Sequence, residues 1–148
     1  MKFRDFAAGQ TLRAGPYAVD ERTVVAFARD WDPQWFHTDR EAAAGGPFGG
    51  LIASGWQTCG IAMKLAVDHF LGDSESYASP GVAYIRWPAP VRPGDVLWLV
   101  ADVIETRTSQ RKPLLGVMRW RWRLVNQDGV EVLDLETTSF FDLAVDRK

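Results

Sequence analysis

The stretch FGGLIASGWQTCGIAMKLAVDHFLG, residues 48–72, decides the fold. A glycine-rich segment leads to a predicted helix, which begins near Ser54 and Gly55 and ends at Gly72. Several side chains share one face of the helix at three- and four-residue spacing: Trp56, Cys59, Gly60, Met63, Val67 and Phe70. Small residues thin its surface at Ala53, Gly55, Gly60, Ala62 and Ala66. A curved sheet can pack closely against such a surface, so the sequence predicts a central, buried helix.

From Tyr77 onward the apolar residues alternate with a period of two, which is typical of strands. We expect strands over 81–87, 96–105, 114–125 and 130–141, with Asp128-Gly129 closing a hairpin between the last two. In the third strand one face carries Leu114, Gly116, Met118, Trp120, Trp122 and Leu124, and the other carries Arg119, Arg121 and Arg123. Helical segments followed by a run of strands favour an α+β fold with an antiparallel sheet.

An earlier amphipathic helix is predicted after Asp20, a good N-cap residue. Its apolar positions recur at three- and four-residue spacing: Val24, Phe27, Ala28 and Trp31. The Asp32-Pro33 pair should end it, because the residue before a proline is disfavoured in the helical region.

Length and composition indicate one domain over residues 1–148. The chain has no apolar run long enough to span a bilayer, and its first ten residues lack the pattern of a secretory signal. One cysteine cannot form an intramolecular disulfide, so a cytoplasmic location is the expectation. The net charge of −2 gives no general basic field for nucleic acid.

The densest polar cluster is residues 30–39, DWDPQWFHTD. A carboxylate and an imidazole a few residues apart on an irregular turn can share one water as a general acid and base, and Asp32 and His37 fit that description. Asp30 is a rival carboxylate. The alternative is structural, with Asp32 closing a turn and His37 a satisfied surface side chain.

Residues 48–56 supply a second candidate feature. The free backbone N–H groups at a helix N-terminus, together with its partial positive charge, can stabilise a developing oxyanion. The alternative is that these glycines only form a turn and allow close packing.

Together these segments resemble the MaoC-like dehydratases and (R)-specific enoyl-CoA hydratases over nearly the whole chain. The signature of that family runs roughly Asp-x-Asn-Pro-x-His-x-Asp, followed by an apolar segment and a glycine that opens the central helix. Residues 32–39, DPQWFHTD, are similar to it, and residues 90–95, PVRPGD, resemble the family's turn between strands. The sequence departs from the signature at Gln34 and Trp35, and Ser54 stands where a histidine often precedes the glycine.

The resemblance implies a hot dog fold, in which an antiparallel sheet wraps around a long central helix, and a homodimer that builds acyl-CoA sites. It implies hydration of a trans-2-enoyl-CoA to an (R)-3-hydroxyacyl-CoA, or the reverse dehydration. No metal or redox cofactor is implied, since coenzyme A belongs to the substrate. A thioesterase on the same fold and an inactive acyl-CoA-binding subunit are the competing functions.

By the same resemblance, Asp32 and His37 are the predicted catalytic side chains, and the N–H of Gly55 faces the thioester oxygen. Substrate contacts are predicted for Trp35, Phe48, Ser54 and Trp56, although both tryptophans are equally explained as core or interface filler. A basic group could meet the phosphates of coenzyme A or could be a solvated sheet face and loop: Arg119, Arg121, Arg123, Arg107, Arg111 and Lys112.

Overall fold

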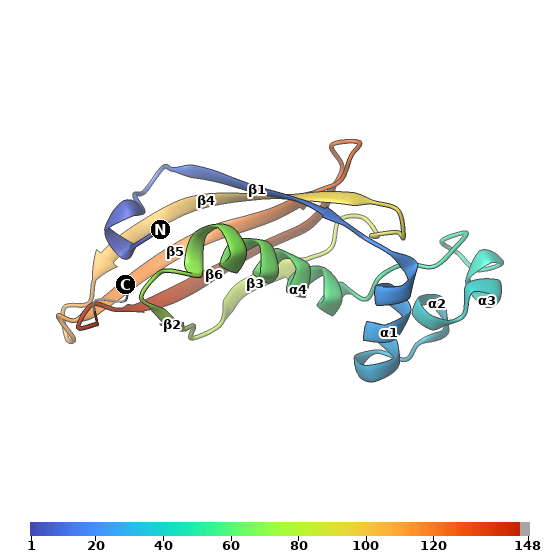
Figure 1. Ribbon diagram of the computed structural model, residues 1–148, viewed down its shortest axis with the longest axis horizontal. Coiled ribbons are helices and arrows are strands. Elements are labelled where there is room, and N and C mark those ends of the chain that lie inside the picture. Colours follow the sequence, from blue (N-terminus) through green and yellow to red (C-terminus); the bar gives the residue numbers. More distant parts are fainter. Residues whose placement is uncertain (146–148) are drawn as a thin grey trace.

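The computed structural model describes residues 1–145, in which an antiparallel sheet runs along a single long helix (Figure 1). The elements in chain order are η1 (Phe3–Asp5), β1 (Thr11–Ala18), α1 (Glu21–Trp31), α2 (Trp35–Thr38), α3 (Arg40–Ala44), α4 (Gly55–Ala66), the π turn η2 (Val67–Leu71), β2 (Ser76–Ala78), β3 (Val82–Arg86), β4 (Val96–Thr108), β5 (Leu115–Val125) and β6 (Glu131–Asp142). This is the hot dog arrangement that the sequence predicts.

The sheet order is β1-β4-β5-β6-β2, and β3 also pairs with β6. All of these pairs are antiparallel, and β5 and β6 form the predicted hairpin. The sequence pattern did not predict β1, because Gly15-Pro16 in its middle is typical of a turn. In the structure the register shifts between Ala14 and Tyr17, so the proline lies at an irregularity of an edge strand, where it is tolerated.

The two faces of β5 differ as predicted. Its inward side chains are buried: Gly116, Met118, Trp120, Trp122 and Leu124. The prediction is wrong for Leu114, which precedes the strand and is exposed. On the outer face Arg121 forms a bidentate pair with Asp134, at 2.9 Å for both bonds, and Arg123 lies 2.8 Å from Asp102. The outer face is therefore a ladder of internal ion pairs.

The apolar stripe that the spacing identifies on α4 is not the face that packs on the sheet. The side chains that face the sheet are Thr58, Ile61, Ala62, Leu65 and Ala66. Trp56 is 60% exposed and Met63 48% exposed, Gly60 and Val67 are also exposed, and Cys59 is half-buried. Of this stripe only Phe70, in the π turn, is buried. Spacing identified an apolar stripe, but the smaller residues pack on the sheet because they allow the closer approach. A single chain thus leaves the larger apolar stripe of α4 open.

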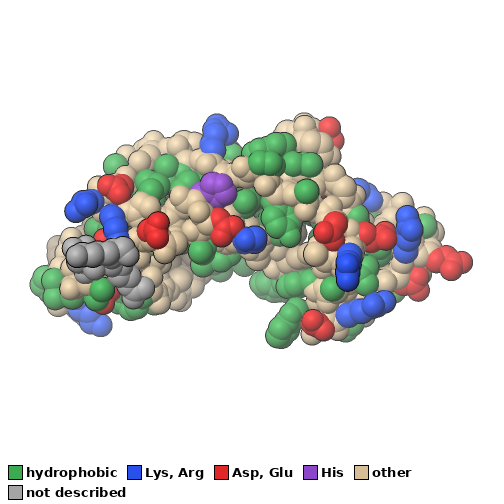
Figure 2. All heavy atoms as spheres, viewed as in Figure 1, with side chains coloured by type: hydrophobic (Ala, Val, Ile, Leu, Met, Phe, Trp, Pro, Cys, Tyr) green, Lys and Arg blue, Asp and Glu red, His purple; other side chains and the backbone are tan. Residues whose placement is uncertain are grey.

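The segment α1–α3 projects beyond one end of the sheet (Figure 1). Asp20 caps α1 by accepting from the N–H of Thr23, and the helix ends at Trp31, as predicted. Trp31 does not join its apolar face, because it is exposed at the last turn. Figure 2 shows charged side chains of both signs gathered over this end, with hydrophobic side chains at the surface where it meets the sheet and α4.

Candidate active site

Asp32 and His37 lie side by side where α1 ends. The backbone N–H of Asp32 donates to Ala28 at 2.8 Å, which makes Asp32 the C-cap of α1, and His37 follows in the single turn of α2. The Nε2 atom of His37 lies 3.1 Å from Oδ2 of Asp32. The His37 side chain is buried, so it is not the surface histidine of the structural alternative. Asp30 is exposed, and among residues 1–145 it makes no hydrogen bond or ion pair with the imidazole.

The orientation of the His37 ring is fixed by the loop that leads to α4. Its Nδ1 lies 2.7 Å from the carbonyl oxygen of Ile52, and the N–H of Ile52 donates to the carbonyl of Phe36 at 3.1 Å. Because a carbonyl can only accept, Nδ1 carries the hydrogen and Nε2 is directed to Asp32. The contact between Nε2 and Oδ2 is a hydrogen bond only when imidazole and carboxyl share one further proton. In this geometry the imidazole and the carboxylate can hold a proton between them and transfer it.

Two neutral donors hold the Asp32 carboxylate. Gln34 Nε2 donates to Oδ1 and Ser54 Oγ donates to Oδ2, each at 2.8 Å. Burial opposes ionisation of the carboxyl, but these hydrogen bonds, with the charge and hydrogen bond of His37, outweigh it and lower the pKa of Asp32 below its ordinary value. Asp32 is therefore ionised over a wide pH range.

The N-terminus of α4 lies next to this pair. Ser54 is its N-cap, accepting from the N–H of Trp56 at 3.3 Å, and the N–H of Ala53 donates to Val91 at 2.8 Å. Within the described chain the N–H of Gly55 has no protein acceptor. Such a free N–H at the first turn of a helix can donate to a developing negative charge.

Asp32 and Gly55 open into the same pocket, of about 290 Å³. Its other lining residues are Trp56, Thr58, Trp87, Ala89, Pro90 and Val91. A neighbouring pocket of about 320 Å³ is lined by Phe48, Ile52 and residues 87–90. Carboxylate, free amide and apolar walls thus meet in one cleft, which is the setting for polar chemistry on an apolar ligand.

The predicted ligand-contact residues are not all in this cleft. Trp56 and Phe48 line it, while Ser54 is fully buried and turned toward Asp32. Trp35 lines neither pocket and packs against Gly46 and Phe36. Contacts of these four residues with a substrate stay predictions. Sequence reasoning missed Trp87, whose signal was its place at the end of a predicted strand, directly before the proline-rich turn that closes the pocket.

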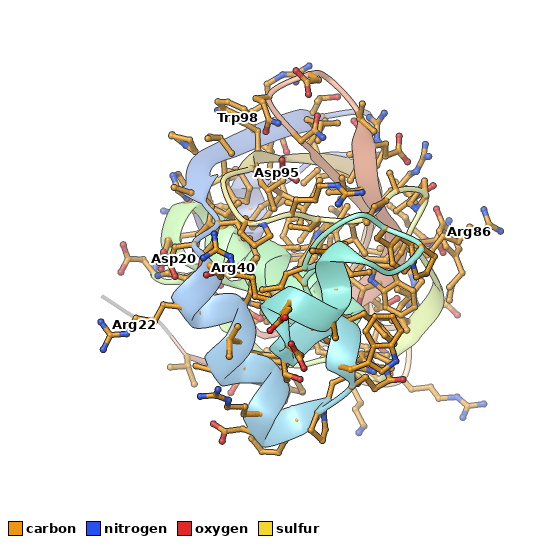
Figure 3. All side chains as sticks on the ribbon, turned by 90° about the vertical axis from the view of Figure 1, so that its right-hand side faces the viewer. Asp20, Arg22, Arg40, Arg86, Asp95 and Trp98 are labelled. Carbon is orange, nitrogen blue, oxygen red and sulfur yellow. The ribbon has the colours of Figure 1, made fainter. Side chains whose placement is uncertain are left out.

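The end-on view in Figure 3 shows α1 and the two short helices facing the viewer, with Asp20 and Arg40 labelled on that end. Arg40 pairs with Glu21 at 3.3 Å. Among residues 1–145 no group of three metal-ligating side chains comes together, and no helix is long and apolar enough to cross a bilayer. The expectation that the protein needs no metal stays a prediction.

The sequence of this chain matches one protein family over most of its length. A family model described as a MaoC like domain matches residues 5–117. This chain belongs to the MaoC-like family. The family match spans β1, the α1–α3 segment with Asp32 and His37, α4, and the sheet as far as β5.

Relatives of this MaoC-like protein agree. Over 137 residues it is 32% identical to the uncharacterized protein YdeM of Bacillus subtilis, covering 92% of this chain and 95% of that one. It is 39% identical over 91 residues to the 3-hydroxyacyl-thioester dehydratase Z of Mycobacterium tuberculosis, or 60% of each chain. A MaoC-like dehydratase structure from Rhodospirillum rubrum superposes with a TM-score of 0.86 at 33% identity, covering 94% of both chains.

Proposed function

We propose that this MaoC-like protein adds water to a trans-2-enoyl-CoA to give an (R)-3-hydroxyacyl-CoA, or catalyses the reverse dehydration. The observation that carries the proposal is the 3.1 Å contact between Asp32 and His37 beside the free N–H of Gly55. Hydration needs a base for water, an acid for the α-carbon and a donor for the thioester oxygen, and these groups can supply all three. The motif's resemblance to (R)-specific hydratases supports the stereochemistry.

In the proposed mechanism a water molecule binds between the Asp32 carboxylate and His37. As the pair takes a proton from this water, its oxygen forms a bond to the β-carbon, and the β-carbon to α-carbon π bond shifts toward the carbonyl. The N–H of Gly55 donates to the enolate oxygen that develops. The proton held by the pair then goes to the α-carbon on the same face, which restores the thioester and completes the addition.

Ser54 and Gln34 have a positioning role in this mechanism. Both donate to the carboxylate of Asp32 and keep it ionised. An ionised carboxylate accepts a hydrogen bond from water, whereas a protonated one would compete for the role of donor. The buried Ile52 carbonyl in turn keeps the Nε2 side of His37 directed to the reacting water.

We also propose that the protein is a homodimer and acts in the cytoplasm. It needs no cofactor beyond the coenzyme A that belongs to the substrate. The apolar stripe of Trp56, Met63 and Val67 is open to solvent in one chain. It lies beside β3, which in the described residues is paired on one side only, with β6. An open strand edge beside an apolar stripe is suited to a second copy of the same chain.

The direct test is loss of the conjugated enoyl absorbance when the protein is mixed with trans-2-enoyl-CoA thioesters, followed by chiral analysis of the product. We expect turnover to the (R)-alcohol. Release of free thiol from saturated acyl-CoA with no hydration would instead identify a thioesterase. Binding of acyl-CoA without turnover of any enoyl thioester would identify a non-catalytic binding subunit.

A further inference from the structure

Trp87, which follows β3, contacts the first turn of α4. Its Nε1 donates to the carbonyl oxygen of Gly55 at 3.0 Å. A methyl group on Gly55 would lie 2.5 Å from Cε2 of the indole, so the ring rests directly on the glycine backbone. The ring also meets Trp56 edge-on, with centroids 5.6 Å apart. Glycine is thus required at position 55 because the indole occupies the space of its side chain.

The indole of Trp87 is a wall of the cleft. It lines the pocket that contains Asp32 and also the neighbouring pocket that contains Phe48. The side chain is 43% exposed and held by one hydrogen bond and ring contacts, so it belongs to the ligand site and not to the core.

A third pocket, of about 220 Å³ and almost wholly apolar, is not lined by Trp87 itself but by residues near it in the chain and in space. It lies between α4 and the sheet and is lined in part by Cys59, Met63, Ile85 and Trp122. Cys59 is one turn after Gly55, and its thiol interacts with the Trp87 indole, although burial dominates and raises the pKa of the thiol. Ile85, in β3, precedes Trp87 by two residues. Trp87 therefore lines the catalytic pocket and lies close to Cys59, which lines the apolar one.

We infer that Trp87 sets the limit on acyl-chain length by closing the passage from the catalytic pocket into this apolar pocket. The inference rests on the proposed function and names its substrate class, short-chain enoyl thioesters. A short acyl group ends before the indole, whereas a longer one needs the space that the indole fills. Removing the ring would join two apolar volumes and let the additional methylenes be buried, each of which is favourable.

The test compares but-2-enoyl-CoA with oct-2-enoyl-CoA for the wild type, Trp87→Leu and Trp87→Phe. For the wild type we expect kcat/KM to favour the shorter substrate by about tenfold or more, and for Trp87→Leu that ratio should fall by at least about tenfold. Trp87→Phe keeps most of the ring and should lie between them. Trp98→Leu is the matched control, since Trp98 lines none of these pockets and lies far from Arg86, the neighbour of Trp87 (Figure 3).

A second measurement separates this inference from the proposed reaction. The affinities of butanoyl-CoA and octanoyl-CoA, measured by calorimetry, should show the same change of preference in Trp87→Leu without any catalysis. A wild type that accepts both lengths equally, or a folded Trp87→Leu whose preference is unchanged in both measurements, overturns the role of Trp87. Absence of hydration by the wild type overturns the proposed reaction, while the binding preference still decides the role of Trp87.

Discussion

The hydroxyl of Ser54 donates to Oδ2 of Asp32, the same oxygen that faces the imidazole of His37. Ser54 is also the N-cap of α4. One side chain therefore joins the start of the central helix to the acid of the candidate site, and the helix end and the carboxylate hold each other in place.

Replacing Ser54 by alanine should change both stability and pH dependence. Loss of the cap should cost about 1 kcal/mol in the free energy of unfolding. Loss of the donor should raise the pKa of Asp32 toward its ordinary value, so the acid limb of the kcat/KM profile should move to higher pH. Asp20→Ala removes the cap of α1 and should lower stability without moving that limb. An unchanged limb in Ser54→Ala would refute the positioning role.

Asp32→Asn and His37→Ala should each lower turnover of an enoyl-CoA by about 100-fold or more, because each removes one partner of the acid-base pair. Circular dichroism should show that both variants are folded. Asp30→Asn is the matched control, since Asp30 is exposed and removed from the imidazole, and its turnover should equal that of the wild type. Normal activity in either pair variant would end the mechanism.

Gly55→Ala should destabilise the protein by about 1–3 kcal/mol, because its methyl group would meet the indole of Trp87 at 2.5 Å. In the double variant with Trp87→Ala the space is open, so part of this loss should be recovered. At Gly45, where a methyl group meets only an ordinary contact at 3.8 Å, the same substitution should be nearly neutral. Equal denaturation midpoints for Gly55→Ala and the wild type would contradict the contact.

Arg121→Met should cost about 2 kcal/mol, because it leaves the buried carboxylate of Asp134 without its bidentate partner. Arg107→Met removes only an exposed pair at 3.6 Å and should cost about 0.5 kcal/mol or less. Since Arg121 is already paired within the sheet, we expect no change of KM for an acyl-CoA. A large rise of KM would instead indicate that the coenzyme phosphates meet this face.

The same ion pair predicts an acid sensitivity. The hydrogen bonds from Arg121 lower the pKa of Asp134 in the folded protein, although burial opposes this. The stability that this gives is present in full above the unfolded pKa of about 3.9 and is lost as pH falls through the folded value. Melting temperatures followed from neutral to acidic pH should therefore fall less steeply at the acidic end for Arg121→Met than for the wild type.

Met63→Glu should convert the proposed dimer to monomers, because it places a charge in the open apolar stripe of α4. Sedimentation velocity would measure the change. Leu114→Glu is a control of similar exposure in the loop before β5, and it should leave the assembly intact. A wild type that sediments as a monomer at all concentrations would refute the dimer.

The sequence predicted most of the sheet and the capped starts of α1 and α4, because alternation and caps are local signals. It could not predict β1, where Gly15-Pro16 masks a strand that only pairing with β4 defines. It identified the apolar stripe of α4 but not the face that packs on the sheet, because periodicity reveals a stripe and not what covers it.

The sequence predicted only part of the candidate site, for a similar reason. Asp32 and His37 lie in one short motif, so the sequence already indicated their proximity, and the structure brings the two side chains together. Trp87 lies 32 residues after the glycine that it touches. A contact over that separation depends on how β3 packs beside α4, which no local pattern encodes.

Asp32 ends one helix through its backbone N–H, and its carboxylate accepts a hydrogen bond from Ser54, the residue that opens another. Acid, imidazole and free amide are thereby contained in the short segment 32–55, outside the strands. Substitutions in the strands that leave the contacts of Trp87 and Val91 with this segment in place can therefore alter the stability of the fold without moving the three groups relative to one another.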